Sequence, residues 1–175
     1  RRIAKELIAG GNPEGLRIAT ELLRSDIERH PESSGSYYLL AQAATMTGRT
    51  EEAISLNQKT LQLDPNNVIA INNLAWLLCE EQGQCQRALE LANRGLGIRP
   101  DYIDLIETRG VIHYHLGNMD EAVRDLTRSI ELYPDNAAAL ALTHYHLARA
   151  YAQMGRRTEA IEQIDIGGPA MIRSA

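Results

Sequence analysis

The sequence predicts an all-α protein that is built from successive antiparallel helix pairs. The first observation is a period of about 34 residues along most of the 175-residue chain. The second is a helical spacing of apolar residues between the periodic positions. The third is the placement of glycine and proline where helices are expected to end, because glycine accepts positive φ and proline cannot continue a helix.

The period is carried by four separate series of residues. Proline recurs 34 or 35 residues apart, at Pro31, Pro65, Pro100 and Pro134. Alanine follows at Ala19, Ala53, Ala88, Ala122 and Ala160, glycine at Gly48, Gly83, Gly117 and Gly155, and a small residue at Ala41, Ala75, Gly110 and Ala148. The last interval of these three series is longer, at 38 residues. Residue types that differ in chemistry but share one period indicate a structural repeat.

Residues 1–33 are predicted to be a partial, degenerate repeat, and residues 34–67 to be the first complete one. The partial repeat keeps the alanine and the proline of the series but lacks the other markers. In the complete repeat, Leu40, Ala41 and Ala44 have the spacing of one buried helical face. A first helix should therefore end near the marker glycine, and a second helix should end before the marker proline.

Residues 68–102 and 103–136 are predicted to be the second and third complete repeats. Leu74, Ala75 and Leu78 repeat the apolar spacing of the preceding unit. Acidic residues open the second helix of several repeats, where a carboxylate complements the helix dipole and needs no catalytic role. They are Glu51, Glu52, Asp120, Glu121 and Glu159.

Residues 137–166 are predicted to be a fourth repeat with an insertion of one helical turn. Four extra residues precede its small marker residue, which corresponds to about 6 Å of added helix. We therefore expect one long helix over residues 137–154. Residues 167–175 begin Gly-Gly-Pro, and we expect them to form a tail outside the repeats.

These units resemble the tetratricopeptide repeat, in which a leucine, a small residue and a tyrosine mark the first helix and an alanine marks the second. The fourth repeat carries this pattern at Leu147, Ala148, Tyr151, Gly155 and Ala160. The resemblance implies a right-handed superhelical solenoid of stacked antiparallel helix pairs. It also implies a scaffold that binds other proteins. Residues 72–78 further resemble repeats of large bacterial scaffolds for envelope and exopolysaccharide export.

In this family the first helices of successive pairs line a concave groove, and the resemblance carries that role to particular residues. The implied partner-binding residues are Tyr38, Gln42, Met46, Asn72, Asn73, Trp76, Glu107, Val111, Tyr114, His115, Tyr145 and Arg149. Tyrosine, tryptophan, methionine and arginine are enriched in protein interfaces. Trp76 lies in the middle of the series, where it would anchor a ligand, or would pack in the core if the register differs by one residue.

The charges of this surface predict the chemistry of the partner. Asp104 and Glu107 make one wall acidic, so we expect a protein or peptide that carries Lys or Arg beside an apolar anchor. Chaperone-binding members of the family clamp a C-terminal carboxylate with Lys, Asn and Arg. Of the positions that match this clamp, only Asn73 fits, which disfavours a chaperone tail as the ligand.

Two pairs of residues are predicted to have structural roles. Arg109 replaces the usual leucine of the third repeat, and Asp125 lies on the facing side of the second helix. Because an unpaired buried charge is strongly disfavoured, we expect a direct ion pair between them. Cys79 and Cys85 flank one turn, where they would form a disulfide in an exported protein or pack as small residues in a reducing compartment.

Several other classes of function are disfavoured by composition and spacing. The net charge of −5 argues against nucleic acid as a partner, and no continuous apolar stretch is long enough for a membrane span. The histidines of the two His-Tyr-His triplets, at residues 113–115 and 144–146, are two residues apart and point to different sides of a helix. We therefore expect no metal, no cofactor and no catalytic residue.

Three readings of the function stay open at the level of sequence. The first is a scaffold that holds an extended peptide or a partner helix in its groove. The second is a module that forms a homo-oligomer through uncapped terminal repeats. The third is a regulatory arm of an enzyme outside this segment, since the chain begins at Arg1 without an initiator Met and we expect it to be a piece of a longer protein. The sequence does not distinguish a bacterial cytoplasmic location from a periplasmic one.

Overall fold

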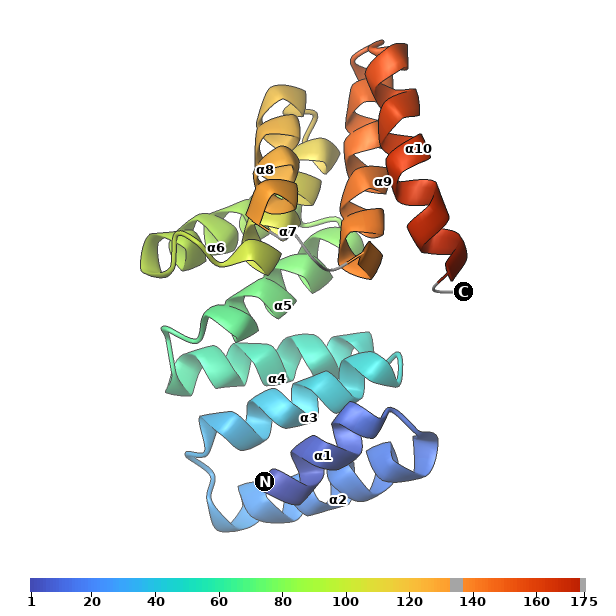
Figure 1. The fold of residues 1–175 in the computed structure, drawn as a ribbon. Coiled ribbons are helices and arrows are strands. Elements are labelled where there is room, and N and C mark those ends of the chain that lie inside the picture. The colour runs from blue at the N-terminus through green and yellow to red at the C-terminus, as the bar shows by residue number, and fades with distance from the viewer. Residues whose placement is uncertain (133–136, 174–175) are drawn as a thin grey trace. The chain divides into compact units, whose positions relative to one another are not determined.

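The computed structural model describes residues 1–132 and 137–173, and it describes the side chains of residues 1–132 and 140–167. The described residues form ten helices and no strand (Figure 1). The chain divides into two compact units, Arg1–Gln82 and Gly83–Ala175. This architecture confirms the predicted all-α class.

The first unit contains five helices. They are α1 (Arg2–Gly10), α2 (Pro13–Arg29), α3 (Ser34–Met46), α4 (Thr50–Leu63) and α5 (Val68–Glu80). α1 packs on α2 and α3 packs on α4, while α2 also contacts α3 and α4 contacts α5. Asparagine side chains cap two of these helices. Asn12 Oδ1 accepts a hydrogen bond from the Gly15 N–H at 2.7 Å, and Asn67 Oδ1 accepts one from the Ala70 N–H at 3.0 Å.

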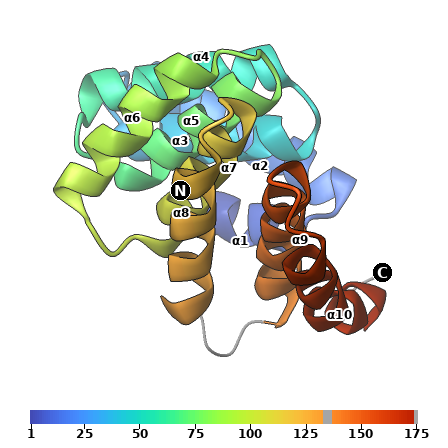
Figure 2. The ribbon, with the colours of Figure 1, turned by 90° about the horizontal axis from the view of Figure 1, so that it is seen from above.

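The second unit also contains five helices. They are α6 (Cys85–Ile98), α7 (Ile103–His115), α8 (Met119–Leu132), α9 (Ala137–Gln153) and α10 (Arg157–Arg173). Each helix contacts the next, and α7 also contacts α9. Figures 1 and 2 both show α9 and α10 side by side. The marker Pro134 lies outside the described residues.

Glycine ends the turn between the two helices of each pair. The predicted series has positive φ throughout, with values of 70° at Gly48 and 80° at Gly117. A side chain would be strained in this conformation, which explains why the position recurs. Gly11 has a φ of 64° and occupies the same place between α1 and α2, so it is a further member that the sequence series did not include.

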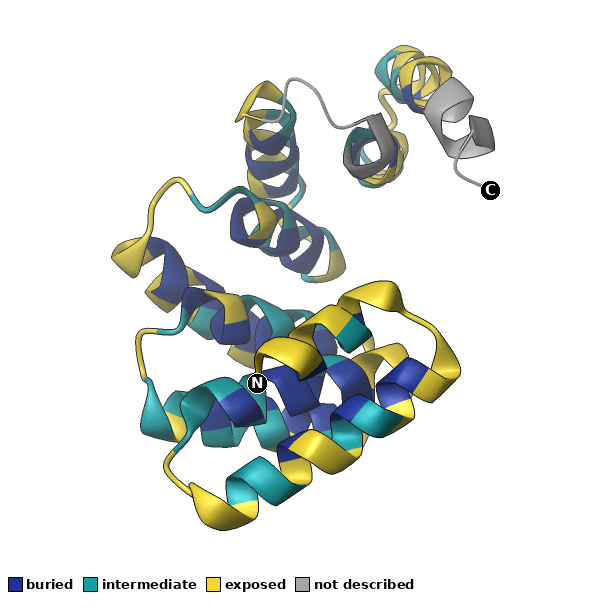
Figure 3. Cartoon of the chain, turned by 60° about the horizontal axis from the view of Figure 1, so that its bottom comes forward, coloured by how far each residue is buried: buried dark blue, intermediate teal, exposed yellow. Residues whose placement is uncertain are grey.

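The small residues of the marker alanine series lie inside the packed helices. The alanines of the marker series are almost completely buried, from Ala19 at 0% exposure to Ala160 at 6%. In Figure 3 the helices carry buried residues along one side and exposed residues along the other. The core of the first unit contains Ala4, Ile8, Leu16, Ala19, Leu23, Leu39, Leu40 and Ala43. The predicted core leucines Leu74 and Leu147 are also buried.

Residues 2–29 form two regular helices, of which the first is short at nine residues. One expectation about the ends of the chain needs correction. Residues 167–173 belong to α10 and are not a tail. The reason is packing, because a Cβ on Gly167 would lie 3.0 Å from His144 Cβ and 3.3 Å from the Ala141 carbonyl oxygen. The absence of a side chain at Gly167 lets α10 continue close against α9.

The inserted turn is accommodated in a single helix. α9 has 17 residues, whereas α3, α5 and α7 have 13 each. Its bounds, Ala137–Gln153, confirm the long helix predicted for residues 137–154 to within one residue.

Candidate partner-binding surfaces

In the first unit, the predicted binding residues lie on α3 and α5. Tyr38, Gln42 and Met46 are four residues apart on α3 and therefore share one face of that helix. Met46 is 51% exposed, whereas Tyr38 and Gln42 are partly buried. Burial raises the pKa of the Tyr38 hydroxyl above its ordinary value. These three residues can offer a ligand the apolar side chain of Met46, the hydroxyl of Tyr38 and the amide of Gln42.

On α5, the amides of Asn72 and Asn73 precede Trp76 by one turn or less. All three side chains are partly buried. The Oδ1 atom of Asn72 is buried and accepts no hydrogen bond from any described residue. The partial burial of Trp76 is compatible with an aromatic anchor.

In the second unit, α7 and α9 bring several predicted residues into direct contact. The Arg149 guanidinium lies over the Tyr114 ring, 4.6 Å from its centroid, and over the Tyr145 ring, 5.6 Å from its centroid. Gln153 Nε2 donates to the Tyr114 hydroxyl at 3.1 Å. The Tyr114 and His115 rings also meet edge to face, with their centroids 5.4 Å apart. These contacts hold the cationic and aromatic side chains in one surface.

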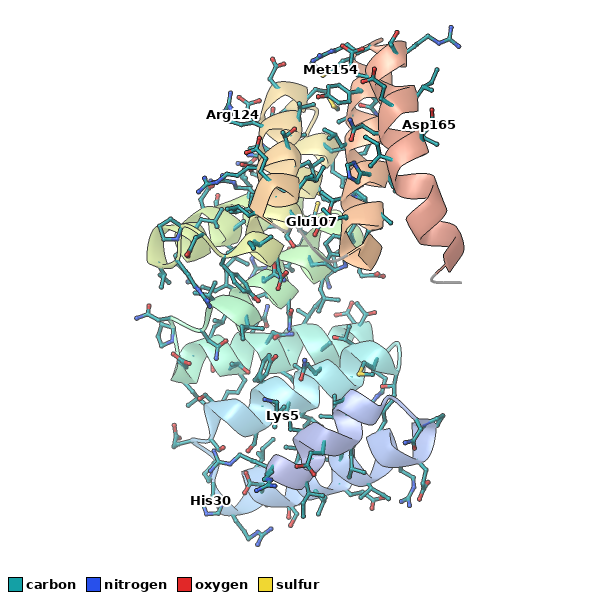
Figure 4. The ribbon with its side chains drawn as sticks, in the orientation of Figure 1. Lys5, His30, Glu107, Arg124, Met154 and Asp165 are labelled. Atoms are coloured by element: carbon teal, nitrogen blue, oxygen red, sulfur yellow. The ribbon has the colours of Figure 1, made fainter. Side chains whose placement is uncertain are left out.

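The acidic end of the same surface is built around Glu107. Its Oε1 atom accepts a hydrogen bond from Thr143 Oγ1 at 2.8 Å, which links α7 to α9. Figure 4 shows Glu107 between these helices. Burial raises the pKa of the Glu107 carboxyl, the hydrogen bond from Thr143 lowers it, and the charge of Asp104 raises it. A cationic group on a ligand would favour the ionised carboxylate.

Val111 does not belong to this exposed surface. The sequence placed it among the groove residues, but its side chain is only 2% exposed and is therefore part of the core. On a helix, residues that are four apart share a face only approximately, and the neighbouring helices cover this position. Val111 packs in the core beneath the surface residues and cannot contact a ligand.

Two contributing residues were missed at the level of sequence. Gln153 lies four residues after Arg149, which lies four residues after Tyr145, so an extension of this stripe by one turn would have identified it. Thr143 lies outside the stripe, and only its contact with Glu107 identifies it.

The predicted ion pair between Arg109 and Asp125 is present. Arg109 Nε donates to Asp125 Oδ2 at 2.6 Å and Nη2 donates to Oδ1 at 2.8 Å, which gives a two-point contact between α7 and α8. Arg109 Nη1 also donates to Asn93 Oδ1 of α6 at 3.1 Å. The Asp125 side chain is 7% exposed. The arginine is therefore a structural link among three helices.

The first unit also contains a shallow depression of about 330 Å³ between α2 and the α3–α4 turn. Its arginines are already paired with glutamates. Arg17 contacts Glu14 and Glu21, and Arg24 contacts Glu52 at 3.0 Å. Such paired arginines have little affinity left for an acidic ligand, so this depression is a weaker candidate than the α7–α9 surface.

Neither cysteine is a free thiol in the structure, since Cys79 and Cys85 are both disulfide-bonded. Within the described ranges, no cluster of three or more His, Cys, Asp or Glu side chains is arranged to hold a metal ion. No helix in those ranges is both long enough and apolar enough to cross a membrane.

Comparison with known sequences decides the family. Sequence models of the tetratricopeptide repeat match residues 6–68, 56–90, 74–145 and 141–165. The chain belongs to the tetratricopeptide-repeat family. The matched segments together cover both units, which agrees with the periodic alanine and glycine positions described above.

Curated relatives are distant and much longer. The TPR repeat-containing protein PA4667 of Pseudomonas aeruginosa is 24% identical over 140 residues, which is 78% of this chain and 23% of that protein. The mitochondrial import receptor subunit TOM70 of Homo sapiens is 25% identical over 128 residues, which is 73% of this chain and 21% of that protein. The chain thus spans less than a quarter of the length of these relatives.

Solved structures of other proteins have the same fold. PilW, described as a type IV pilus biogenesis factor, has a TM-score of 0.83 at 18% identity, with 97% of this chain and 75% of that chain covered. MamA has a TM-score of 0.75 at 17% identity, with 92% of this chain and 91% of that chain covered. YrrB, described as a TPR protein with an unusual peptide-binding site, has a TM-score of 0.72 at 20% identity, with 95% and 82% covered.

Proposed function

We propose that this chain is a non-catalytic protein-interaction scaffold that holds an extended peptide or a partner helix against the first helices of its repeats. The observation that carries this proposal is the α7–α9 surface, where Arg149 lies over Tyr114 and Tyr145 and Glu107 accepts a hydrogen bond from Thr143. Aromatic and arginine side chains held in fixed positions are typical of the residues that dominate binding energy.

The fold and the family support the same reading. Stacked helix pairs bury one face against their neighbours and present the other face as an extended binding surface. The similarity to YrrB, which is described as having a peptide-binding site, is compatible with a peptide ligand. The acidic residues Asp104 and Glu107 favour a ligand with a basic side chain, and Trp76 and Met46 of the first unit favour an apolar anchor.

A test of this function begins with selection of peptides from an unbiased displayed library, followed by affinity measurement with the purified chain. We expect Trp76→Ala to weaken binding of a selected peptide by more than about tenfold, or ~1.4 kcal/mol, while the melting temperature changes little. Fluorescence anisotropy of the labelled peptide measures the affinity, and circular dichroism measures the melting temperature.

Tyr37→Ala provides a matched control in the same unit. Tyr37 is also partly buried on α3, but Lys59 of α4 lies over its ring at 5.9 Å, so it lies on the side that faces the next helix. This substitution should lower stability and leave peptide affinity unchanged. A Trp76→Ala variant that melts much earlier but binds as tightly as wild type would show that Trp76 is a core residue. An absence of any selected peptide would argue against the scaffold function.

A second candidate function is self-assembly through the last helix. Ile161 and Ile164 lie on one side of α10 and are 59% and 57% exposed. Two large apolar side chains that are this exposed on one helix are suited to contact with a second copy of the chain.

A further inference from the structure

The guanidinium of Arg149 is held in place but is not neutralised. Its central carbon lies 4.6 Å from the centroid of the Tyr114 ring and 5.6 Å from that of the Tyr145 ring, and it forms no ion pair with any residue in the described part of the chain. Two other arginines of the second unit are paired with carboxylates, Arg109 with Asp125 and Arg156 with Glu159. A guanidinium that lies over aromatic rings and has no carboxylate partner keeps N–H groups available, and these groups match the two oxygens of a carboxylate.

The opposite charge lies at the other end of the same surface. Glu107 contacts Thr143, and Asp104 lies one turn before it on α7 and is close enough to raise the pKa of Glu107. No basic residue in the described ranges forms an ion pair with Glu107 or Asp104. The surface therefore has an acidic end and a basic end, and neither end forms an ion pair with a residue of the described ranges.

The separation of the two ends follows from helix geometry. Glu107 meets Thr143, and further along both helices Tyr114 meets Arg149 and Gln153, so α7 and α9 run in the same direction. Seven residues separate Glu107 from Tyr114 and six separate Thr143 from Arg149. At 1.5 Å per residue, the two helices give similar separations of roughly 9–10.5 Å along their axes.

We propose that the α7–α9 surface binds an extended peptide that carries a basic and an acidic side chain three residues apart, with the basic group at Glu107 and the acidic side chain at Arg149. This inference rests on the proposed scaffold function and specifies the ligand of its second unit. A polyproline-II peptide rises about 3.1 Å per residue with three residues per turn, so residues i and i+3 point the same way about 9 Å apart.

An extended ligand fits better than a helical one. A helix would have to place its charges seven residues apart to span the same distance on one face, at about 10 Å. A segment that short is marginally helical in water, whereas polyproline II is a major conformation of unfolded chains. The extended peptide therefore loses less conformational entropy when it binds.

The test compares amidated peptides of one apolar-polar background, so that only side chains supply carboxylates. One set places Lys and Glu one, three, five or seven residues apart, and a second set replaces the Glu of the three-residue spacing with Gln or Lys. Wild type should bind the Lys-x-x-Glu peptide about fivefold to tenfold more tightly than the Lys-x-x-Lys peptide. Arg149→Glu should reverse this preference, because it exchanges the sign of the charge at the basic end.

Arg124→Glu is the matched control, since Arg124 is an exposed arginine on α8 of the same unit and lies away from Glu107 in Figure 4. It changes the net charge equally and should leave the preference unchanged. Equal binding of the Glu, Gln and Lys peptides would overturn the inference and leave the scaffold function in place. A best binder with seven-residue spacing would replace the extended ligand with a helical one. Failure of all of these peptides and of the unbiased library would reject both proposals.

Discussion

At the scale of single residues, the second unit contains a partly buried ion pair between Arg109 and Asp125. Arg109 is 22% exposed and Asp125 is 7% exposed, and two hydrogen bonds join them. The arginine replaces a position that is apolar in related repeats, so its carboxylate partner compensates for desolvation. Asn93 of α6 satisfies a third N–H group.

We predict that Asp125→Ala destabilises the protein by about 2–4 kcal/mol, because it leaves a partly buried guanidinium without its counter-charge. Urea denaturation followed by circular dichroism measures this loss. A double variant, Arg109→Leu with Asp125→Leu, should recover most of the stability, since an apolar pair needs no desolvation of charge. A change below about 0.5 kcal/mol for Asp125→Ala would contradict a stabilising role for the pair.

The lowered pKa of His146 leads us to predict that the stability of the protein depends on pH. Burial is the main cause that lowers its pKa from 6.5 to about 4, and the charges of Arg149 and His115 lower it further. The unfolded chain therefore binds more protons than the folded chain between these two values. Stability should fall as pH decreases from 6.5 toward 4, and this contribution should level off below pH 4.

We expect this contribution to be about 1–2 kcal/mol, because the ring is only partly buried. The measurement is urea denaturation of wild type and of His146→Gln at pH 7 and at pH 4.5. The variant should lose less stability than wild type over this interval. If both proteins lose the same amount, His146 is not buried in its neutral form.

At the scale of helices, the distance between α7 and α8 depends on a residue without a side chain. A Cβ on Gly110 would lie 2.8 Å from Leu126 Cγ and 3.2 Å from the Leu126 backbone nitrogen. Leu126 is completely buried and has no room to move away. The two helices approach each other so closely here that the small marker residue of the third repeat has to be glycine.

We predict opposite effects for two glycine-to-alanine substitutions in the second unit. Gly110→Ala should destabilise the protein by about 1–3 kcal/mol through overpacking. Gly97→Ala should stabilise it by about 0.4–1 kcal/mol, because α6 has open space at this position and alanine restricts the unfolded chain more than glycine does. Thermal and urea denaturation measure both. A stabilising Gly110→Ala would show that α7 and α8 can separate without cost.

At the scale of the whole molecule, the exposed side of α10 predicts a dependence of molecular mass on concentration. If Ile161 and Ile164 contact a second copy, sedimentation should show association as concentration rises. Ile161→Lys combined with Ile164→Lys should abolish it, because each buried isoleucine contributes about 1.5–3 kcal/mol to such a contact. Glu162→Lys, between them on the helix, is a control for the added charge. A mass that stays monomeric for wild type at all concentrations would reject self-assembly.

The sequence by itself determined the helix pairs, the turn between them and the Arg109–Asp125 contact. Short-range rules govern these features, because a helical face repeats every three to four residues, glycine is needed at positive φ, and a buried charge requires a partner. The same rules placed the long α9 correctly, since an insertion of four residues adds about one turn and rotates the buried face by only about 40°.

The tertiary structure alone decided which first-helix residues are available to a partner. Val111 has the spacing of a groove residue, yet neighbouring helices cover it, whereas Thr143 lacks that spacing and still reaches Glu107. The tertiary structure also decided that residues 167–173 continue α10, because Gly167 permits a close contact with α9, where a Cβ would lie only 3.0 Å from His144 Cβ. Exposure, and contact between residues that are more than 20 positions apart, depend on how the helices pack, and local sequence patterns do not contain that information.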